Sequence, residues 1–210
     1  YMYEKIKRTF DIIFSLSSLI FFAPLFLFIY FVLLFANGRP VFFKQIRMGL
    51  LGKKFKLYKF RTMRKNLSSK NLSLTVEDDM RITTVGRHLR KLKLDELPQI
   101  INILLGDMSF VGPRPEVPIY YSNIPSSYKR FLQKIRPGLT DFATLHYINE
   151  SSLLLRVTDP EAFYRKKILP NKTRLQYFYF VKRSFLIDLI ILIKTLFAII
   201  RSNKKNNLKY

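Results

Sequence analysis

The stretch IIFSLSSLIFFAPLFLFIYFVLLFA, residues 12–36, contains no charged side chain and consists mostly of Phe, Leu and Ile. As one helix, these 25 residues would extend about 37 Å, enough to cross a hydrocarbon core of about 30 Å. Pro24 stands at the midpoint, where it removes a backbone hydrogen bond and bends a helix sharply. Each half then extends about 18 Å, enough to reach the middle of a bilayer and return.

Basic residues flank this apolar run on both sides, namely Lys5, Lys7, Arg8, Arg39, Lys44 and Arg47. Positive charge beside a membrane segment marks its cytoplasmic side, and here both ends carry it. We therefore expect a re-entrant membrane helix hairpin over about residues 10–37, broken at Pro24. A single helix that crosses the membrane is the alternative.

The composition of the chain favours an anionic partner and a membrane. In 210 residues there are 37 Lys and Arg against 14 Asp and Glu, a formal net charge of +23. Such a balance predicts nucleic acid, anionic lipid or a polyphosphorylated substrate as partner. The hydrophobic fraction of 49% favours membrane lipids, and we expect no nucleic acid. Cysteine is absent, and the two histidines, His88 and His146, are too few for a zinc site.

The rest of the chain shows no linker and no repeat that would divide it, so we expect a single domain of mostly helical α+β class. Residues 38–184 form its central part. Residues 185–201 are apolar but interrupted by Asp188 and Lys194, which favours an amphipathic helix associated with the membrane surface. Residues 202–210 form a basic tail that we expect to be unstructured.

Two adjacent carboxylates, Asp95 and Glu96, occur in the stretch LDELPQ at residues 94–99. Pro98 is tolerated only in the first turn of a helix, so the acids lie at or just before a helix start. The following apolar residues recur at helical spacing up to Gly106. An ionised Asp at such a place can attack phosphorus to form an acyl phosphate. Plain capping of the helix by Asp95, with Glu96 as a first-turn acid, is the alternative.

Arg114 stands between Pro113 and Pro115, and each proline restricts the backbone around it. A guanidinium on so stiff a segment suits bidentate binding of phosphate oxygens. This interpretation makes Arg114 a candidate phosphate-binding residue.

Three further cations are candidates for the same site. Arg90 lies about one helical turn before the acids, while Lys59 and Arg61 belong to a basic and aromatic strand-like run at residues 54–62. We expect all three to supply positive charge for phosphate groups. Contact with lipid headgroups, or a solvated surface, is the alternative for each of them and for Arg114.

In this order the motifs resemble those of the bacterial sugar transferases, the monotopic polyprenyl-phosphate phosphoglycosyl transferase family. The matching segments span about 130 residues and are 7–11, Pro24, 41–45, 59–63, 79–83, 86–90, 94–99, 106–115 and 136–138. So many ordered matches make the resemblance highly specific.

The resemblance implies transfer of a sugar-1-phosphate from a UDP-sugar to polyprenyl (undecaprenyl) phosphate, with release of UMP. It also implies a place at the cytoplasmic face of the bacterial inner membrane and a role as first membrane step of a surface glycan pathway. By the same resemblance Asp95 is the nucleophile that carries a covalent phosphosugar, Glu96 supports it, and Mg²⁺ bridges Asp95 and the diphosphate. Arg90 and Arg114 then hold phosphate oxygens. A non-catalytic module that binds anionic lipid is the alternative function.

The chain departs from the family's usual pattern after Arg136. Most members continue with Pro-Gly-Ile-Thr-Gly-Trp-Ala-Gln, whereas residues 137–144 here are PGLTDFAT. Ala23 also precedes Pro24 where Ser is usual. We therefore leave the sugar and the residues that recognise it unassigned, and a homo-oligomer stays open.

Overall fold

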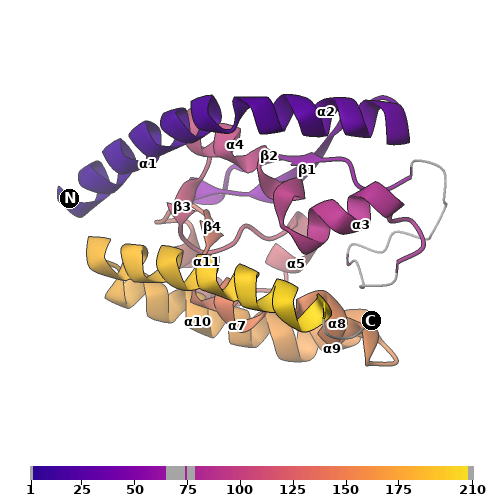
Figure 1. The fold of residues 1–210 in the computed structure, drawn as a ribbon. Helices are drawn as coiled ribbons and strands as arrows, with labels where there is room; N and C mark the ends of the chain where they lie inside the picture. The colour runs from indigo at the N-terminus through magenta and orange to yellow at the C-terminus, as the bar shows by residue number, and fades with distance from the viewer. Residues whose placement is uncertain (1, 65–73, 75–78, 208–210) are drawn as a thin grey trace.

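The computed structural model describes residues 2–64, 74 and 79–207, with side chains up to Arg201. The described part is mostly helical with two small sheets, as expected for a mostly helical α+β protein. Two long helices, α1 (Met2–Phe21) and α2 (Ala23–Asn37), run along one side of the molecule, and α10 (Leu169–Lys182) and α11 (Phe185–Asn207) run along the opposite side (Figure 1). The two sheets lie between these layers (Figure 1).

The apolar run is broken, as predicted. α1 and α2 meet at Phe22 and are bent by 60°. Pro24 lies in the first turn of α2, and because it has no N–H, the carbonyl of Ile20 loses its usual helical donor. Among the described residues, only this bent pair, and no single helix, has the length and apolar composition for a membrane span. The re-entrant path through a membrane stays a prediction.

The first sheet is an antiparallel hairpin beneath α2. Its strands β1 (Phe42–Met48) and β2 (Lys54–Phe60) pair with Phe42 opposite Phe60 and Met48 opposite Lys54, and a 3-10 turn at Leu50–Gly52 joins them. A buried cluster packs α2 onto this sheet and onto α3 (Thr84–Lys91); its members are Ile29, Leu33, Val41, Phe60 and Leu89. The extended segment predicted for residues 54–62 is thus a strand up to Phe60.

The second sheet is a parallel pair, β3 (Ser109–Val111) and β4 (Gly138–Thr140). A Cβ on Gly138 would lie 2.1 Å from the backbone nitrogen of Gly112, so only glycine permits this close approach of the two backbone segments. The main core surrounds this pair and consists of Leu57, Ile103, Met108, Phe110, Val111, Ile135, Tyr179 of α10 and Ile191 of α11. Phe10 of α1 packs against it, so this core contacts both outer layers.

Short helices fill the rest of the middle layer and its edge. They are α4 (Gln99–Leu105), α5 (Pro118–Tyr121), α6 (Ser126–Leu132), α7 (Phe142–His146), α8 (Glu150–Leu155) and α9 (Pro160–Phe163), with a π-helical turn at Tyr164–Ile168. A further buried cluster joins them to α10 and includes Tyr120, Leu154, Tyr164 and Leu169.

One expectation about the end of the chain is wrong. The basic tail was predicted to be unstructured from residue 202, but α11 continues to Asn207. Ser, Lys and Asn, the residues of 202–207, are compatible with a helix that an apolar segment has already nucleated, because each further residue adds a hydrogen bond without a new nucleation cost. The apolar residues Leu186, Leu189, Ile193 and Phe197 of α11 are exposed, and its contact with a membrane surface stays a prediction.

Candidate active site

The two carboxylates lie in a 3-10 turn, Leu94–Glu96, between α3 and α4. Lys93, just before the turn, adopts a left-handed backbone with φ of 58°. Pro98 follows in helical conformation immediately before the first residue of α4. The prediction that both acids come just before a helix start is therefore confirmed.

Asn102 fixes this turn relative to β2. Its side chain is fully buried and accepts a hydrogen bond of 3.0 Å from the backbone N–H of Tyr58, while its Nδ2 donates to the carbonyl of Lys56 at 2.8 Å. The bonds hold α4 against the strand that carries Lys59. Nothing in the local sequence pattern marks Asn102 as functional, apart from its being a polar residue within the apolar pattern of the helix.

Glu96 forms ion pairs with two of the predicted cations. Its Oε1 accepts from Lys59 Nζ at 2.7 Å and from Arg114 Nη2. Burial alone would raise the pKa of Glu96, but the charges of Arg114 and Lys59 outweigh burial and hold this pKa well below its usual value. Glu96 is therefore ionised and its charge is already compensated by the protein.

Asp95 has the opposite electrostatic environment. It is 5% exposed, and none of the described side chains donates a hydrogen bond to it. Burial and the neighbouring charge of Glu96 raise the pKa of Asp95, while Lys59, Arg90 and Lys93 oppose that shift. Adjacent titratable groups whose surroundings move their pKa values apart are typical of active sites in which the two groups have different chemical roles.

Arg114 is held rigidly by the second sheet. Its backbone N–H donates to Asp141 Oδ2 at 3.3 Å, and its Nη1 donates to the carbonyl of Leu139 at 3.2 Å. Glu96 raises the pKa of Arg114 despite the opposing effect of burial. The side chain is nevertheless 31% exposed, so the guanidinium stays accessible to a ligand beside Glu96.

Asp141 is a positioning residue that the sequence did not identify. It is fully buried, accepts from the N–H and hydroxyl of Thr144 at 2.6 and 2.8 Å, and so caps α7 while it binds the backbone of Arg114. It occupies a position where the chain departs from the family's usual glycine, and that departure was its one signal.

The other two predicted cations take different places. Arg90, near the end of α3, donates from Nε to Thr62 Oγ1 at 3.1 Å, and its charge lowers the pKa of Asp95. Arg61 donates to the carbonyls of Asn37 and Gly38 at the end of α2 and forms no ion pair with Glu96. The structure therefore brings Lys59, Arg90 and Arg114 around the carboxylates, whereas Arg61 faces α2.

The carboxylates at the turn fit a magnesium ion that takes one ligand from the protein and the others from substrate phosphate and water. Among the residues that the structure describes, no three Asp, Glu, His or Cys side chains gather into a metal-binding group. Mg²⁺ commonly binds one or two carboxylates and takes its other ligands from phosphate and water. Asp95 meets that requirement because its oxygens have no donor in the described structure, whereas Glu96 is occupied by two cations.

Comparisons with known proteins agree with the motifs. The family model described as bacterial sugar transferase matches residues 2–202. Similar proteins include the uncharacterized sugar transferase EpsL of Bacillus subtilis, 42% identical over 147 residues that cover 70% of this chain and 71% of that protein. The exopolysaccharide production protein ExoY of Sinorhizobium fredii is 35% identical over 92% of this chain and 84% of its own. The UDP-glucose:undecaprenyl-phosphate glucose-1-phosphate transferase of Escherichia coli is 35% identical over 67% of this chain and 31% of its own.

Proposed function

This chain belongs to the bacterial sugar transferase family and is a phosphoglycosyl transferase, and we propose that it moves a sugar-1-phosphate from a UDP-sugar to undecaprenyl phosphate through a covalent intermediate on Asp95. The observation that carries the proposal is the contrast between the two neighbouring acids. Glu96 is ion-paired to Lys59 and Arg114, whereas Asp95 has no described donor and its pKa is raised. Asp95 is thus the carboxylate available to form a bond.

In the first step an Asp95 oxygen attacks the β-phosphorus of the UDP-sugar. The bond between that phosphorus and the oxygen bridging to the α-phosphate breaks, and UMP leaves with the electron pair. In the second step an oxygen of polyprenyl phosphate attacks the same phosphorus, and Asp95 leaves as a carboxylate. Arg114 and Arg90 are proposed to bind the phosphate oxygens during both steps, because guanidinium groups suit phosphate.

Glu96 is proposed to orient rather than to remove a proton. Its lowered pKa makes it a weak base, and its Oε1 already accepts from Lys59 and Arg114. It therefore aligns both cations toward the phosphate groups. Mg²⁺, bound by Asp95 together with the substrate phosphates, would neutralise charge that otherwise repels an attacking carboxylate.

The same proposal places the enzyme at the membrane where its acceptor resides. Relatives are named for undecaprenyl phosphate, a membrane lipid, and the bent apolar pair α1 and α2 is basic at both ends. We propose the cytoplasmic face of the inner membrane, since positive flanks mark the cytoplasmic side. A hairpin held there would keep the carboxylates level with the lipid phosphate.

The test is release of UMP from a panel of UDP-sugars without acceptor lipid. We expect a burst of about one UMP per enzyme, because the first step ends on Asp95. Asp95→Asn should reduce the rate of this UMP release by at least about 10³-fold. The matched control is Asp159→Asn, since Asn also caps helices well and Asp159 only caps α9. Absence of UMP release with every UDP-sugar, even with polyprenyl phosphate present, would favour a lipid-binding module that has no transferase activity.

A further inference from the structure

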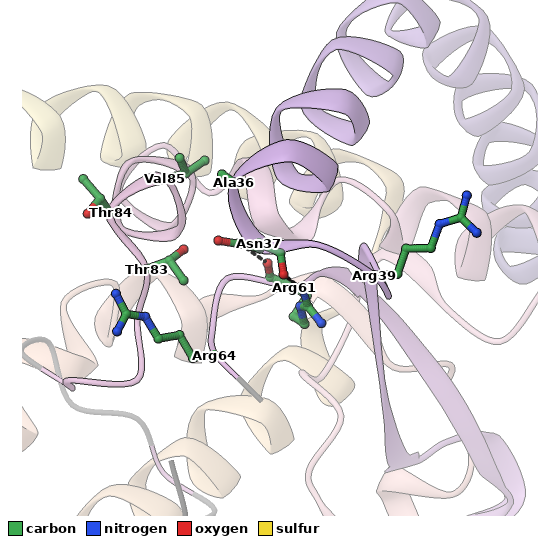
Figure 2. Close-up of a pocket in the computed structure, with 8 residues that line it drawn as sticks. All are labelled: Ala36, Asn37, Arg39, Arg61, Arg64, Thr83, Thr84 and Val85. Carbon is green, nitrogen blue, oxygen red and sulfur yellow. Dashed lines mark hydrogen bonds between the residues drawn. The ribbon is translucent and has the colours of Figure 1, made fainter. Parts of the chain in front are cut away.

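A cavity of about 420 Å³ lies between the end of α2 and the start of α3. Figure 2 shows its lining, which includes Ala36, Asn37, Arg61, Arg64, Thr84 and Val85. Asp95, Glu96, Lys59 and Arg114 are not among the lining residues, so the cavity is distinct from the carboxylate site. Its volume is in the range of pockets for small ligands.

The lining is cationic and only partly compensated. Arg61 is 8% exposed and donates to two carbonyls of the α2 end, but its buried Nε–H has no acceptor among the described residues. Arg64 is exposed, and no described carboxylate pairs with its side chain. None of the described lining residues is acidic. The chemistry that such a lining recognises is an anion.

The first turn of α3 adds backbone donors to the same cavity. The Thr83 hydroxyl caps this helix by accepting from the N–H of Gly86 at 3.0 Å. The N–H groups of Thr84 and Val85 have no acceptor within the described parts of the chain. Free amides at a helix start favour phosphate, and Arg64 and Thr83 both line this cavity (Figure 2).

The surroundings of the cavity indicate what carries the anion. It opens beside Ala36 and Asn37 in the last turn of α2, the second helix of the bent apolar pair. Phe35 of this turn is 84% exposed, and Phe31, one turn earlier, is 51% exposed. An apolar chain attached to the anion would find an apolar helix surface next to the cavity. A free ion or a nucleotide would make no use of that surface.

We propose that this cavity binds the phosphate group of a membrane lipid, held by Arg61, Arg64 and the first amides of α3. The recognised chemistry is phosphate, and the adjoining exposed aromatic residues of α2 favour a lipid as its source. The inference goes beyond the transfer reaction and does not depend on it, because it concerns binding at residues other than the carboxylate pair.

The test is protection of arginine from phenylglyoxal, measured by peptide mass spectrometry on the full chain in a non-ionic detergent. Dihexanoylphosphatidic acid should slow the modification of Arg64 at least fivefold. It should leave unchanged the rate at Arg130, an exposed arginine of α6 outside the cavity. Inorganic phosphate and UDP should require at least tenfold higher concentrations for the same protection. Equal protection by either would overturn the lipid assignment, and no protection of Arg64 by any probe would overturn the site.

The helix amides are tested by one pair of substitutions at Thr84. Thr84→Pro removes the N–H of the first helical residue but keeps the helix, because proline suits this position and Thr83 already has an extended ψ of 159°. Thr84→Ala is the control that loses the hydroxyl and retains the N–H. We expect the protection of Arg64 by dihexanoylphosphatidic acid to require about three- to tenfold more lipid in Thr84→Pro than in Thr84→Ala. Equal behaviour of the two variants would contradict binding through the α3 amides.

Discussion

At the residue scale, two neighbouring acids differ because of what surrounds each. Glu96 meets Lys59 and Arg114, which hold its pKa low, whereas burial raises the pKa of Asp95. The arrangement depends on Arg114, and Arg114 depends on Asp141, which binds its backbone N–H. A buried carboxylate that forms no ion pair with the described side chains therefore holds the backbone of Arg114 in place.

The role of Asp141 predicts a pH dependence of stability. Burial raises its pKa in the folded chain, although hydrogen bonds from Thr144 oppose the shift. The folded chain therefore holds this proton more strongly than the unfolded chain, and the group's contribution to stability falls as pH rises through the raised pKa. Asp141→Asn cannot titrate, so the stability of the parent relative to this variant should be greatest near pH 4 and should decrease toward pH 7.

The measurement is chemical unfolding followed by circular dichroism between pH 4 and pH 7. Near pH 4 we expect the variant to be less stable by about 1–2 kcal/mol, because one acceptor of the carboxyl group becomes an amide donor. The matched control is Asp159→Asn, which makes the same substitution at an exposed helix cap. A gap between parent and Asp141→Asn that widens toward pH 7 would contradict the raised pKa.

Some of the site was predictable from sequence, and some was not. Asp95 and Glu96 were found because Pro98 marks a helix start, and Arg114 because two prolines stiffen its segment. Asn102 and Asp141 were missed because their partners lie on other elements, which no local spacing reveals. Arg61 was grouped with Lys59 by strand alternation, yet the strand ends at Phe60, and Arg61 instead reaches the carbonyls of α2.

At the element scale, the break between α1 and α2 follows from a single residue. Pro24 cannot donate to the carbonyl of Ile20, and its ring crowds the preceding turn, so the two helices separate at Phe22 with a bend of 60°. The apolar composition of the run was visible in the sequence, but the start of α1 at Met2 was not. The basic residues near the N-terminus resembled a flank and instead form the first two turns of the helix.

Replacing this proline should straighten the helix pair. In Pro24→Ala the missing hydrogen bond is restored, and a continuous helix places residues 13 and 35 about 33 Å apart. A bend of 60° shortens that separation by about 4 Å in the parent. The chain contains no cysteine, so Ile13→Cys with Phe35→Cys permits unambiguous spin labelling at two exposed positions.

The separation is measured by pulsed electron paramagnetic resonance in lipid nanodiscs. We expect a longer distance in Pro24→Ala than in the parent, and no change in Leu27→Ala, an exposed neighbour on the same helix. An unchanged distance in Pro24→Ala would mean that packing of α2 on the first sheet, and not the proline, sets the bend.

At the scale of the whole molecule, the two outer layers are joined by buried charge. Lys7 of α1 pairs with Asp188 of α11, and Asp188 also accepts from the hydroxyls of Tyr3 at 2.9 Å and Tyr179 at 2.7 Å. In the sequence Asp188 only interrupted an apolar stretch. Its partner lies 181 residues away, so periodicity in either segment could not reveal the pair.

This buried pair predicts a large and non-additive cost of mutation. The side chains of Lys7 and Asp188 are 8% and 7% exposed, so removal of one leaves the other charge buried without its counterion. Asp188→Asn or Lys7→Met should each lower the free energy of unfolding by about 3–5 kcal/mol. In the double variant no unpaired charge is left, so its loss should be smaller than the sum of the two single losses.

Chemical unfolding in detergent, followed by circular dichroism, measures these differences. The matched control is Glu161→Gln, which breaks the exposed pair with Arg165 and should cost less than about 1 kcal/mol. Additive losses in the double variant would mean that Lys7 and Asp188 do not stabilise each other. The contact of α1 with α4 through Arg8, which donates to the carbonyls of Ile103 and Leu104 at 2.7 and 2.9 Å, would then be the stronger connection between the apolar helix pair and the site. A non-additive result instead makes the Lys7–Asp188 pair the link through which α1 and α11 enclose the middle layer.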